Sequence, residues 1–263
     1  MRRGSPRVRG RDLLVRGLWG SAELVVTLGV VLLLLVVHQL WWTNRQARED
    51  AGRTVQALQR EWGIPSSELV PPVGRSGGGP VGAEPGASAS PLVPRGSGGS
   101  AAPSGPGRAA SPRWDHAYAV LRIPRIGLTA PVAEGTGKGG VLDRGYVGHY
   151  SRTAQAGQAG NFALAGHRNT HGEPFRRIDR LRPGDRITVE TRDAVYTYTV
   201  DKGLAQTLPS DSGVIAPVPR SNVTTSVGYS EPGYYLTLTT CTPEFSSRYR
   251  LVVWGKLTAM RPR

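Results

Sequence analysis

The chain has 263 residues and one cysteine, and its 33 basic against 19 acidic side chains give a formal net charge of +14. A single cysteine excludes an internal disulfide and any metal site built from several thiolates. Only 38 % of the residues are hydrophobic, while glycine (35) and proline (21) are abundant, so part of the chain is expected to lie outside a packed core. The charge suits an anionic surface, such as lipid headgroups or wall polymers. Nucleic acid is not expected as a partner, because no basic helix and no strand with interleaved aromatic and basic residues occurs.

The N-terminal part predicts a membrane anchor. Residues 1–20 form a basic, arginine-rich tail, and an uncharged apolar run between Leu24 and Trp42 follows it. A run of about 20 apolar residues is long enough to cross a bilayer as a helix, and Trp41 and Trp42 lie where an interfacial aromatic belt would be. Arginines before the run place the N-terminus in the cytoplasm. A cleaved signal peptide is the alternative, but no small-residue cleavage site follows, so we expect an anchor over 21–43 and the bulk of the protein outside the cell.

Residues 44–113 are expected to connect this anchor to a folded domain. Val55, Leu58 and Trp62 recur at helical spacing, which predicts a short juxtamembrane helix over 43–62. Residues 63–113 consist mostly of Gly, Pro, Ser and Ala. Such a segment buries too little apolar surface to offset its ordering entropy, so it is interpreted as a flexible stalk.

From residue 114 onward the pattern is typical of an all-β domain that extends to residue 263. Short β-type runs separated by turns cover 117–123, 128–132, 161–165, 186–191 and 194–200, and two more strands follow near the C-terminus. Only 141–145 and 176–181 appear helical. Seven or eight short strands in about 150 residues predict one closed or sandwich-like β-domain. The long, proline-rich connection over 204–230 is expected to form a wall of a binding groove, because connections of that length are usually functional.

The only cysteine, Cys241, lies at the end of a predicted strand. Leucine and threonine alternate before it, Pro243 ends the run, and a second strand begins near Arg248 and Arg250. A thiol beside a guanidinium is a candidate nucleophile, because a nearby positive charge favours the thiolate and can stabilise an oxyanion. The alternative is a small buried hydrophobe, the common state of a free cysteine.

A cysteine nucleophile needs a proton carrier, and His167 is the best candidate because it follows a predicted strand and a glycine. His171 lies four residues further on, which raises the question of a metal site. Zinc would need a third ligand and a helix to align the pair, whereas Asn169 and its neighbours indicate a turn, so no metal is expected. His116 and His149 are interpreted as structural or surface residues.

Three segments resemble one enzyme family. Thr237-Leu-Thr-Thr-Cys241 is similar to the Thr-Leu-x-Thr-Cys signature of sortases, the membrane-anchored transpeptidases of Gram-positive bacteria. The block from Gly160 to Arg168 resembles the sortase histidine segment, and Arg250-Leu-Val-Val resembles the strand that carries the sortase arginine. Further details, among them Leu181-Arg-Pro-Gly-Asp, are most similar to the class E group of actinobacteria. One departure is Thr242, where histidine or another larger residue is expected.

The resemblance implies a closed eight-stranded sortase-type β-barrel with short helices and no cofactor. It implies a transpeptidase that cleaves a C-terminal sorting signal of the Leu-Pro-x-Thr-Gly or Leu-Ala-x-Thr-Gly type between Thr and Gly. Cys241 would form a thioester, His167 would transfer protons, and Arg250 would stabilise the oxyanion. The partners would be surface proteins that bear this signal and an amine of a peptidoglycan precursor. Thr239, Thr240 and Arg248 are candidate substrate contacts, with Arg248 the alternative to Arg250.

Two other functions stay open at this point. The first is a cysteine hydrolase of different specificity, although no known local signature of such an enzyme surrounds Cys241. The second is a non-catalytic, membrane-tethered wall protein that keeps the fold without the activity.

Overall fold

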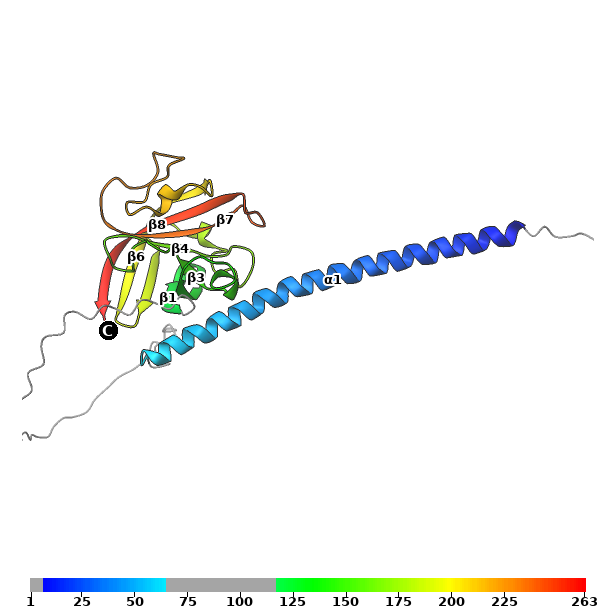
Figure 1. The fold of residues 1–263 in the computed structure, drawn as a ribbon, viewed down its shortest axis with the longest axis horizontal. Helices are drawn as coiled ribbons and strands as arrows, with labels where there is room; N and C mark the ends of the chain where they lie inside the picture. The colour runs from blue at the N-terminus through cyan, green and yellow to red at the C-terminus, as the bar shows by residue number, and fades with distance from the viewer. Residues whose placement is uncertain (1–6, 65–116) are drawn as a thin grey trace, which may run out of the picture.

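The computed structural model describes residues 7–64 and 117–263, which form one long helix and one β-barrel (Figure 1). Helix α1 spans Arg7–Glu61 and is continuous, so the predicted anchor and the predicted juxtamembrane helix are two parts of one element. The first six residues of the basic tail, the predicted stalk from residue 65 onward and His116 lie outside the described residues.

Eight strands build the barrel: β1 (Ala117–Ile123), β2 (Leu128–Glu134), β3 (Val147–His149), β4 (Gly160–Ala165), β5 (Arg186–Thr191), β6 (Ala194–Thr207), β7 (Tyr234–Thr242) and β8 (Tyr249–Pro262). The two expected helical stretches are single 3-10 turns, η3 (Leu142–Arg144) and η4 (Ile178–Arg180). Two others are η2 (Pro124–Ile126) and η5 (Ser212–Ile215). The sequence pattern missed β3, which is too short to show alternation, and ended β6 seven residues early.

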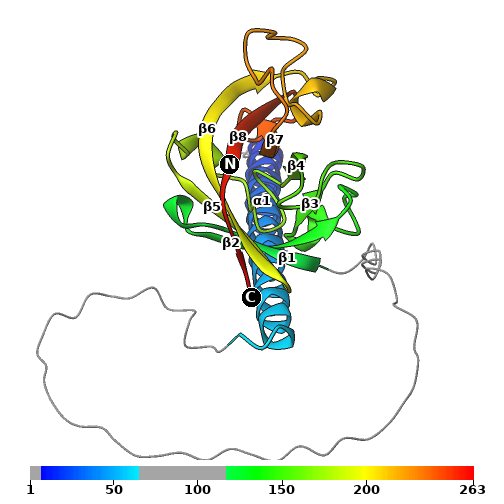
Figure 2. The ribbon, with the colours of Figure 1, turned by 90° about the vertical axis from the view of Figure 1, so that its left-hand side faces the viewer.

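The sheet closes in the order β1-β2-β3-β4-β7-β8-β6-β5, which confirms the expected eight-stranded barrel. Closure leaves no unpaired sheet edge between the first and last strands. Most neighbours are antiparallel, but β2 pairs with β3 and β4 pairs with β7 in parallel. Figure 2 shows the long strands β6 and β8 curving around the barrel. The parallel pair matters for function, because parallel neighbours end at the same edge of the sheet.

Side-chain alternation separates an inner from an outer face in the strands that surround Cys241. Leu236 and Leu238 on β7 and Leu251 and Val253 on β8 point into the main barrel core. The intervening residues point outward, and there Val252 and Trp254 pack against Val214, Tyr229 and Tyr235. The chain between β6 and β7 therefore covers the outer face of β7 and β8, and Trp254 Nε1 donates to the Val214 carbonyl at 3.1 Å.

Asp211 holds this covering segment in place. Its buried carboxylate accepts hydrogen bonds from the Thr207 hydroxyl at 2.5 Å, the Ser221 hydroxyl at 2.6 Å and the Asn222 backbone N–H at 2.8 Å. Burial alone would raise the pKa of Asp211, but these hydrogen bonds, which favour the charged form, lower the pKa below its usual value. The carboxylate thus joins the end of β6 to the loop around Ser221.

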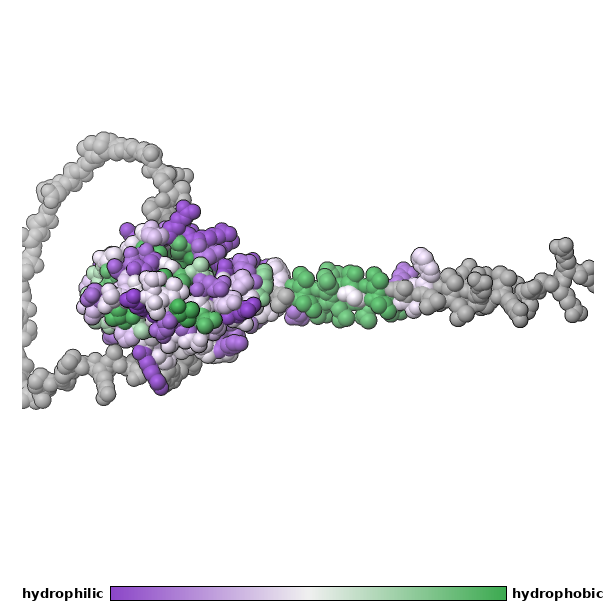
Figure 3. All heavy atoms as spheres, turned by 90° about the horizontal axis from the view of Figure 1, so that it is seen from above, coloured by the Kyte–Doolittle hydropathy of each residue, from purple (hydrophilic) through white to green (hydrophobic). Residues whose placement is uncertain are grey.

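Helix α1 contains a stretch that is apolar enough to cross a membrane. The candidate span, Glu23–Glu61, includes a window with a mean hydropathy of 2.4, none of which is buried against the barrel. Figure 3 shows these apolar side chains as a continuous green band on the helix beyond the barrel. The band satisfies the length and composition of a bilayer-spanning helix.

The last five turns of α1 pack directly against the barrel. Ala51 contacts Ala133, Val141 and Tyr146 in one apolar cluster, and further along the helix Val55 and Leu58 bury Val120. Polar contacts flank the first of these clusters: the Thr54 and Tyr146 hydroxyls lie 2.7 Å apart.

The same part of α1 binds the turn at residues 172–173. Asn44 donates to the Glu173 carboxylate at 2.9 Å. Arg48 forms an ion pair with the same carboxylate at 2.8 Å and donates to the Gly172 carbonyl at 3.1 Å. Glu173 is almost fully buried and also pairs with Arg176 at 2.8 Å, so its charge is compensated on both sides.

Candidate active site

The parallel pairing of β4 and β7 brings the predicted histidine and cysteine to one level of the barrel. Ala165 pairs with Thr239, so the two residues that follow at the same offset are His167 and Cys241. Backbone contacts continue past the end of β4: the Gly166 N–H donates to the Thr239 carbonyl at 3.2 Å, and the Thr240 hydroxyl donates to the Gly166 carbonyl at 2.8 Å. His167 therefore leaves β4 beside the strand end that carries Cys241.

The antiparallel pairing of β7 and β8 adds the predicted arginine. Cys241 and Arg250 are direct cross-strand partners. Directly opposite residues project on the same face with Cβ atoms about 5 Å apart. Cys241 and Arg250 thus lie opposite each other on β7 and β8, and His167 lies two residues past the end of the adjacent strand β4.

All three residues also belong to the outer face of the barrel. Side chains at every second position of a strand share one face, so Cys241 projects on the same side of β7 as Thr237 and Thr239. Arg250 likewise projects on the same side of β8 as Val252. The residues between them on each strand point into the core. Cys241 is half-buried, and the side chain of His167 is 19 % exposed. A thiol and an imidazole here are accessible to a substrate from outside the barrel.

The guanidinium of Arg250 rests on the loop between β7 and β8. Its Nη1 donates to the carbonyls of Ser247 and Tyr249, both at 3.0 Å. Arg248 precedes β8, is exposed and lies over the ring of Tyr249, with its Cζ 5.2 Å from the ring centroid. Of the two arginines, only Arg250 is paired with Cys241 in the strand register.

Thr239 and Thr240 are buried, and each hydroxyl has partners within the protein. The Thr239 hydroxyl donates to the Leu164 carbonyl at 3.2 Å and lies 3.0 Å from the Tyr150 hydroxyl, while Thr240 bonds to Gly166 as described. Both side chains therefore join β7 to the end of β4, just before Cys241 and His167. Their expected contact with substrate stays a prediction.

A second arginine near the cysteine was missed by the sequence analysis. Arg168 is buried; its Nη1 donates to the Thr242 hydroxyl at 2.8 Å and to the carbonyl of Cys241 at 3.3 Å, and its Nη2 pairs with Asp179 at 3.4 Å. Thr242, the residue that departs from the family pattern, is thus one of its hydrogen-bond partners. The position of Arg168 directly after His167 was the one feature of the sequence that could have indicated a place near the site. The hydrogen-bond partners of Arg168 lie in distant segments of the chain, which the sequence alone does not bring together.

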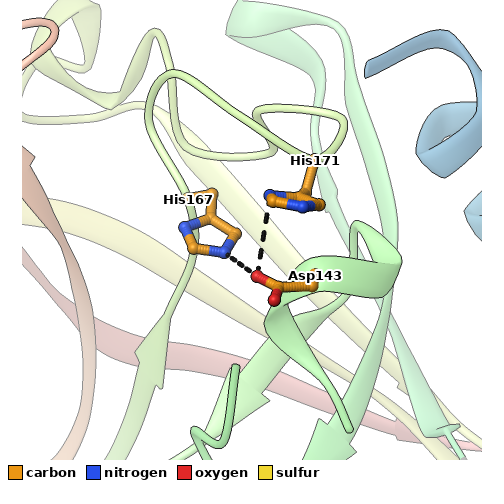
Figure 4. Close-up of side chains that lie close together, drawn as sticks. All are labelled: Asp143, His167 and His171. Carbon is orange, nitrogen blue, oxygen red and sulfur yellow. Dashed lines mark hydrogen bonds and ion pairs between the residues drawn. The ribbon is translucent and has the colours of Figure 1, made fainter. Parts of the chain in front are cut away.

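The histidine candidate has an acidic partner that the sequence analysis also missed. Asp143, on η3, accepts a hydrogen bond from His167 Nε2 at 2.8 Å, and its same oxygen lies 3.6 Å from Nδ1 of His171 (Figure 4). The rings of His167 and His171 are tilted by 32° to each other, with centroids 5.3 Å apart. A carboxylate on Nε2 fixes the ring orientation of His167. No motif links positions 143 and 167, so only the fold reveals this pair.

His149 lies apart from this group and has a structural environment, as expected. It is 1 % exposed on β3, and its Nδ1 lies 2.8 Å from Glu134 and 2.9 Å from the Tyr118 hydroxyl. Burial lowers the pKa of His149, and burial together with the Glu134 charge raises the pKa of Tyr118. The cluster stabilises the β1–β3 side of the barrel.

Comparison with known proteins agrees with this geometry. Residues 121–258, which contain His167, Cys241 and Arg250, match the family model of the sortase domain. The chain is 41 % identical to Sortase SrtE1 of Streptomyces coelicolor over 246 residues, which covers 92 % of this chain and 57 % of that protein. The chain thus spans little more than half the length of this relative. It is also 30 % identical to Sortase SrtE2 of the same organism, over 89 % of this chain and 79 % of that one.

Solved structures show the same similarity. The crystal structure of Sortase E1 from Streptomyces coelicolor, with a tripeptide in its active site, superposes with a TM-score of 0.54 at 49 % identity, over 58 % of this chain and 94 % of that one. The SrtF sortase from Corynebacterium diphtheriae gives a TM-score of 0.52 at 29 % identity, over 61 % of this chain and 93 % of that one. From the barrel, the sequence match and these neighbours together, the chain belongs to the sortase family.

Proposed function

We propose that the protein is a cysteine transpeptidase that cleaves a C-terminal sorting signal between Thr and Gly and transfers the resulting acyl group to an amine. The observation that supports this proposal is the register that pairs Cys241 with Arg250 on β7 and β8 and lets His167 follow the end of the adjacent strand β4. A nucleophile, a proton carrier and a cation at one level of a half-exposed surface are the groups that acyl transfer requires.

The reaction proceeds in two steps at these side chains. The Cys241 thiolate attacks the threonine carbonyl, and the guanidinium of Arg250 stabilises the oxyanion that develops. Imidazolium at His167 protonates the departing glycine amine, which leaves a thioester on Cys241. Neutral imidazole then accepts a proton from the incoming amine as that amine attacks the thioester. Asp143 holds the His167 ring in position through both steps.

The substrate binds beside Cys241 and Arg250, at the end of the outer face of β7 and β8. The segment between β6 and β7 covers the neighbouring part of this face around Trp254, and its attachment through Asp211 and Trp254 suits it to form one wall of a binding groove. The related Sortase E1 holds a tripeptide in its active site, which supports an extended peptide in the equivalent groove here. The donors are surface proteins with a sorting signal, and the acceptor is a peptidoglycan precursor amine.

The apolar segment of α1 anchors the enzyme in the membrane. The arginines before this segment orient the N-terminus to the cytoplasm, so the barrel lies outside the cell, where wall precursors are located. Fractionation of cells tests this: the intact chain is expected in the membrane fraction, and the intact chain in the culture supernatant would overturn the anchor.

A peptide assay tests the proposed activity. The full chain in detergent is incubated with a sorting-signal peptide and an amine, and mass spectrometry identifies the products, with Cys241→Ala as the matched control. A ligated product and a Cys241-linked thioester are expected. Cleavage without ligation at saturating amine would instead indicate a hydrolase. If no peptide in a panel of different sorting signals forms an adduct at Cys241, the protein is the non-catalytic wall protein.

A further inference from the structure

Asp143, His167 and His171 present three ligand atoms toward one point beside the proposed catalytic centre (Figure 4). One carboxylate oxygen and one nitrogen from each ring all lie within 4.8 Å of one another. From this geometry we infer that the cluster is a binding site for a divalent transition metal of the zinc or cobalt type, and that metal binding there inhibits the enzyme.

The donor set matches this class of metal. Two imidazoles and one carboxylate suit Zn²⁺ and Co²⁺, whereas Mg²⁺ and Ca²⁺ prefer oxygen ligands. Zinc bonds of about 2.0–2.2 Å in tetrahedral geometry separate neighbouring ligand atoms by roughly 3.3 Å. The Asp143 oxygen lies 2.8 Å from His167 Nε2 and 3.6 Å from His171 Nδ1, so small side-chain rotations accommodate an ion.

His171 provides a second indication that the site takes a ligand. Its Nδ1 is buried and has no hydrogen-bond partner, although it points at the Asp143 carboxylate. A buried ring nitrogen without a partner is costly unless something else binds it. The residue also has a φ of 51°, a left-handed conformation that is uncommon for histidine and that aims the ring at His167.

The site has an open fourth position. The side chains of His167, Asp143 and His171 are 19 %, 33 % and 31 % exposed, so water or a substrate atom can reach an ion among them. The sequence analysis rejected a metal because a third ligand and an aligning helix were missing. Asp143 supplies the third ligand from 24 residues upstream, and the fold replaces the helix as the element that aligns the histidines.

Inhibition follows from the atom that the ion would occupy. A ligating imidazole nitrogen must be deprotonated, so an ion on Nε2 of His167 prevents this ring from becoming imidazolium. It also removes Asp143 as the partner that positions the ring. The inhibition, unlike the binding, rests on the proposed function, because it requires His167 to act as the general acid.

Binding is tested without reference to activity. Cobalt is titrated into the full chain in detergent, in a Cys241→Ala background that removes the thiolate as a competing ligand, and the visible d–d bands of tetrahedral Co²⁺ are followed. We expect saturable bands, and at least 10-fold weaker binding when His171→Asn or Asp143→Asn is added. Asparagine tolerates the left-handed backbone at position 171, and the exposed Asp193→Asn is the control for loss of one carboxylate elsewhere. Equal cobalt affinity in the His171→Asn and parent backgrounds would overturn the site.

Inhibition is then measured on the protein with Cys241 intact. Zinc is expected to lower the rate of the peptide assay, and EDTA is expected to restore it. Each protein's rate is normalised to its own metal-free rate. On this scale, His171→Asn should need a zinc concentration at least 10-fold higher than the parent for the same inhibition. If His171→Asn is inhibited at the same zinc concentration, the ion acts at the thiolate and the inhibitory role is wrong. If the chain proves inactive toward every peptide, the proposed function fails, while the cobalt titration still decides the metal site.

Discussion

Cys241 and Arg250 occupy directly opposite positions on the antiparallel strands β7 and β8. Arg250→Ala is therefore expected to lower kcat by about 10²–10³-fold, the effect of removing one oxyanion donor. Steady-state kinetics of the peptide assay measures it. The matched control is Arg248→Ala, which removes the same side chain from an exposed position before β8 and should stay close to the parent rate. Near-parent activity in Arg250→Ala would refute the assignment of this residue.

Asp143 is expected to act as a positioning residue for His167. Asp143→Asn keeps the size of the side chain but removes the carboxylate that accepts the hydrogen bond from His167 Nε2, so kcat should fall about 10²-fold while KM changes little. A purely structural role would instead lower the thermal midpoint and leave kcat of the folded fraction intact. Kinetics and thermal unfolding of the same preparation separate the two, and Asp193→Asn serves as the control.

Asp211 is expected to stabilise the protein above the acidic range. Because its pKa in the folded protein is lower than the usual 3.8, the unfolded chain binds the proton more readily. The contribution is therefore complete above pH 3.8 and is lost as the pH falls through the lower pKa of the folded state.

Asp211→Asn should lower the free energy of unfolding by about 2–3 kcal/mol at neutral pH, since charged hydrogen bonds are lost in a buried position. The difference in unfolding free energy between variant and parent should narrow as the pH falls below 3.8. Thermal unfolding of both proteins across this pH range measures it. A difference that is independent of pH would show that the charge of Asp211 is not the cause.

Gly145 sets the approach of α1 to the barrel. It has a φ of 77°, and a Cβ built there would lie 2.8 Å from the carbonyl oxygen of Ala47 on α1. Gly145→Ala should therefore displace the helix in addition to a backbone cost of about 1–2 kcal/mol. Faster hydrogen exchange over residues 44–62 would report the displacement.

The matched control is Gly127→Ala. Gly127 has a similar φ of 66°, but a Cβ at this position would meet no atom within 4 Å, so this variant carries the backbone cost without the contact. Equal hydrogen exchange over residues 44–62 in the two variants would mean that the Gly145 contact does not hold the helix.

Local pattern was enough to predict a closed or sandwich-like β-domain, and the resemblance to sortases narrowed this to an eight-stranded barrel. Alternating side chains and turn residues located most strands, and motif similarity selected Cys241, His167 and Arg250. The pattern failed where tertiary contacts decide the outcome. Strand β3 has only three residues, and Asp143 and Arg168 acquire their partners from segments far away in the chain. The end of β6 was also misplaced, because its pairing with β8 extends a strand whose sequence had already lost its alternation.

Docking of α1 has a consequence for where the proposed enzyme would work. The first helix residues that touch the barrel, Asn44 and Ala47, follow the apolar segment by only a few positions. These residues lie two and five positions after Trp42, so at 1.5 Å per residue the contact lies about 3–8 Å beyond this last interfacial tryptophan. The catalytic groove of an anchored enzyme would then sit at a constant height just above the lipid headgroups, whatever the length of the glycine-rich segment. Sorting signals that emerge close to the bilayer would be within reach, and those held further out in the wall would not.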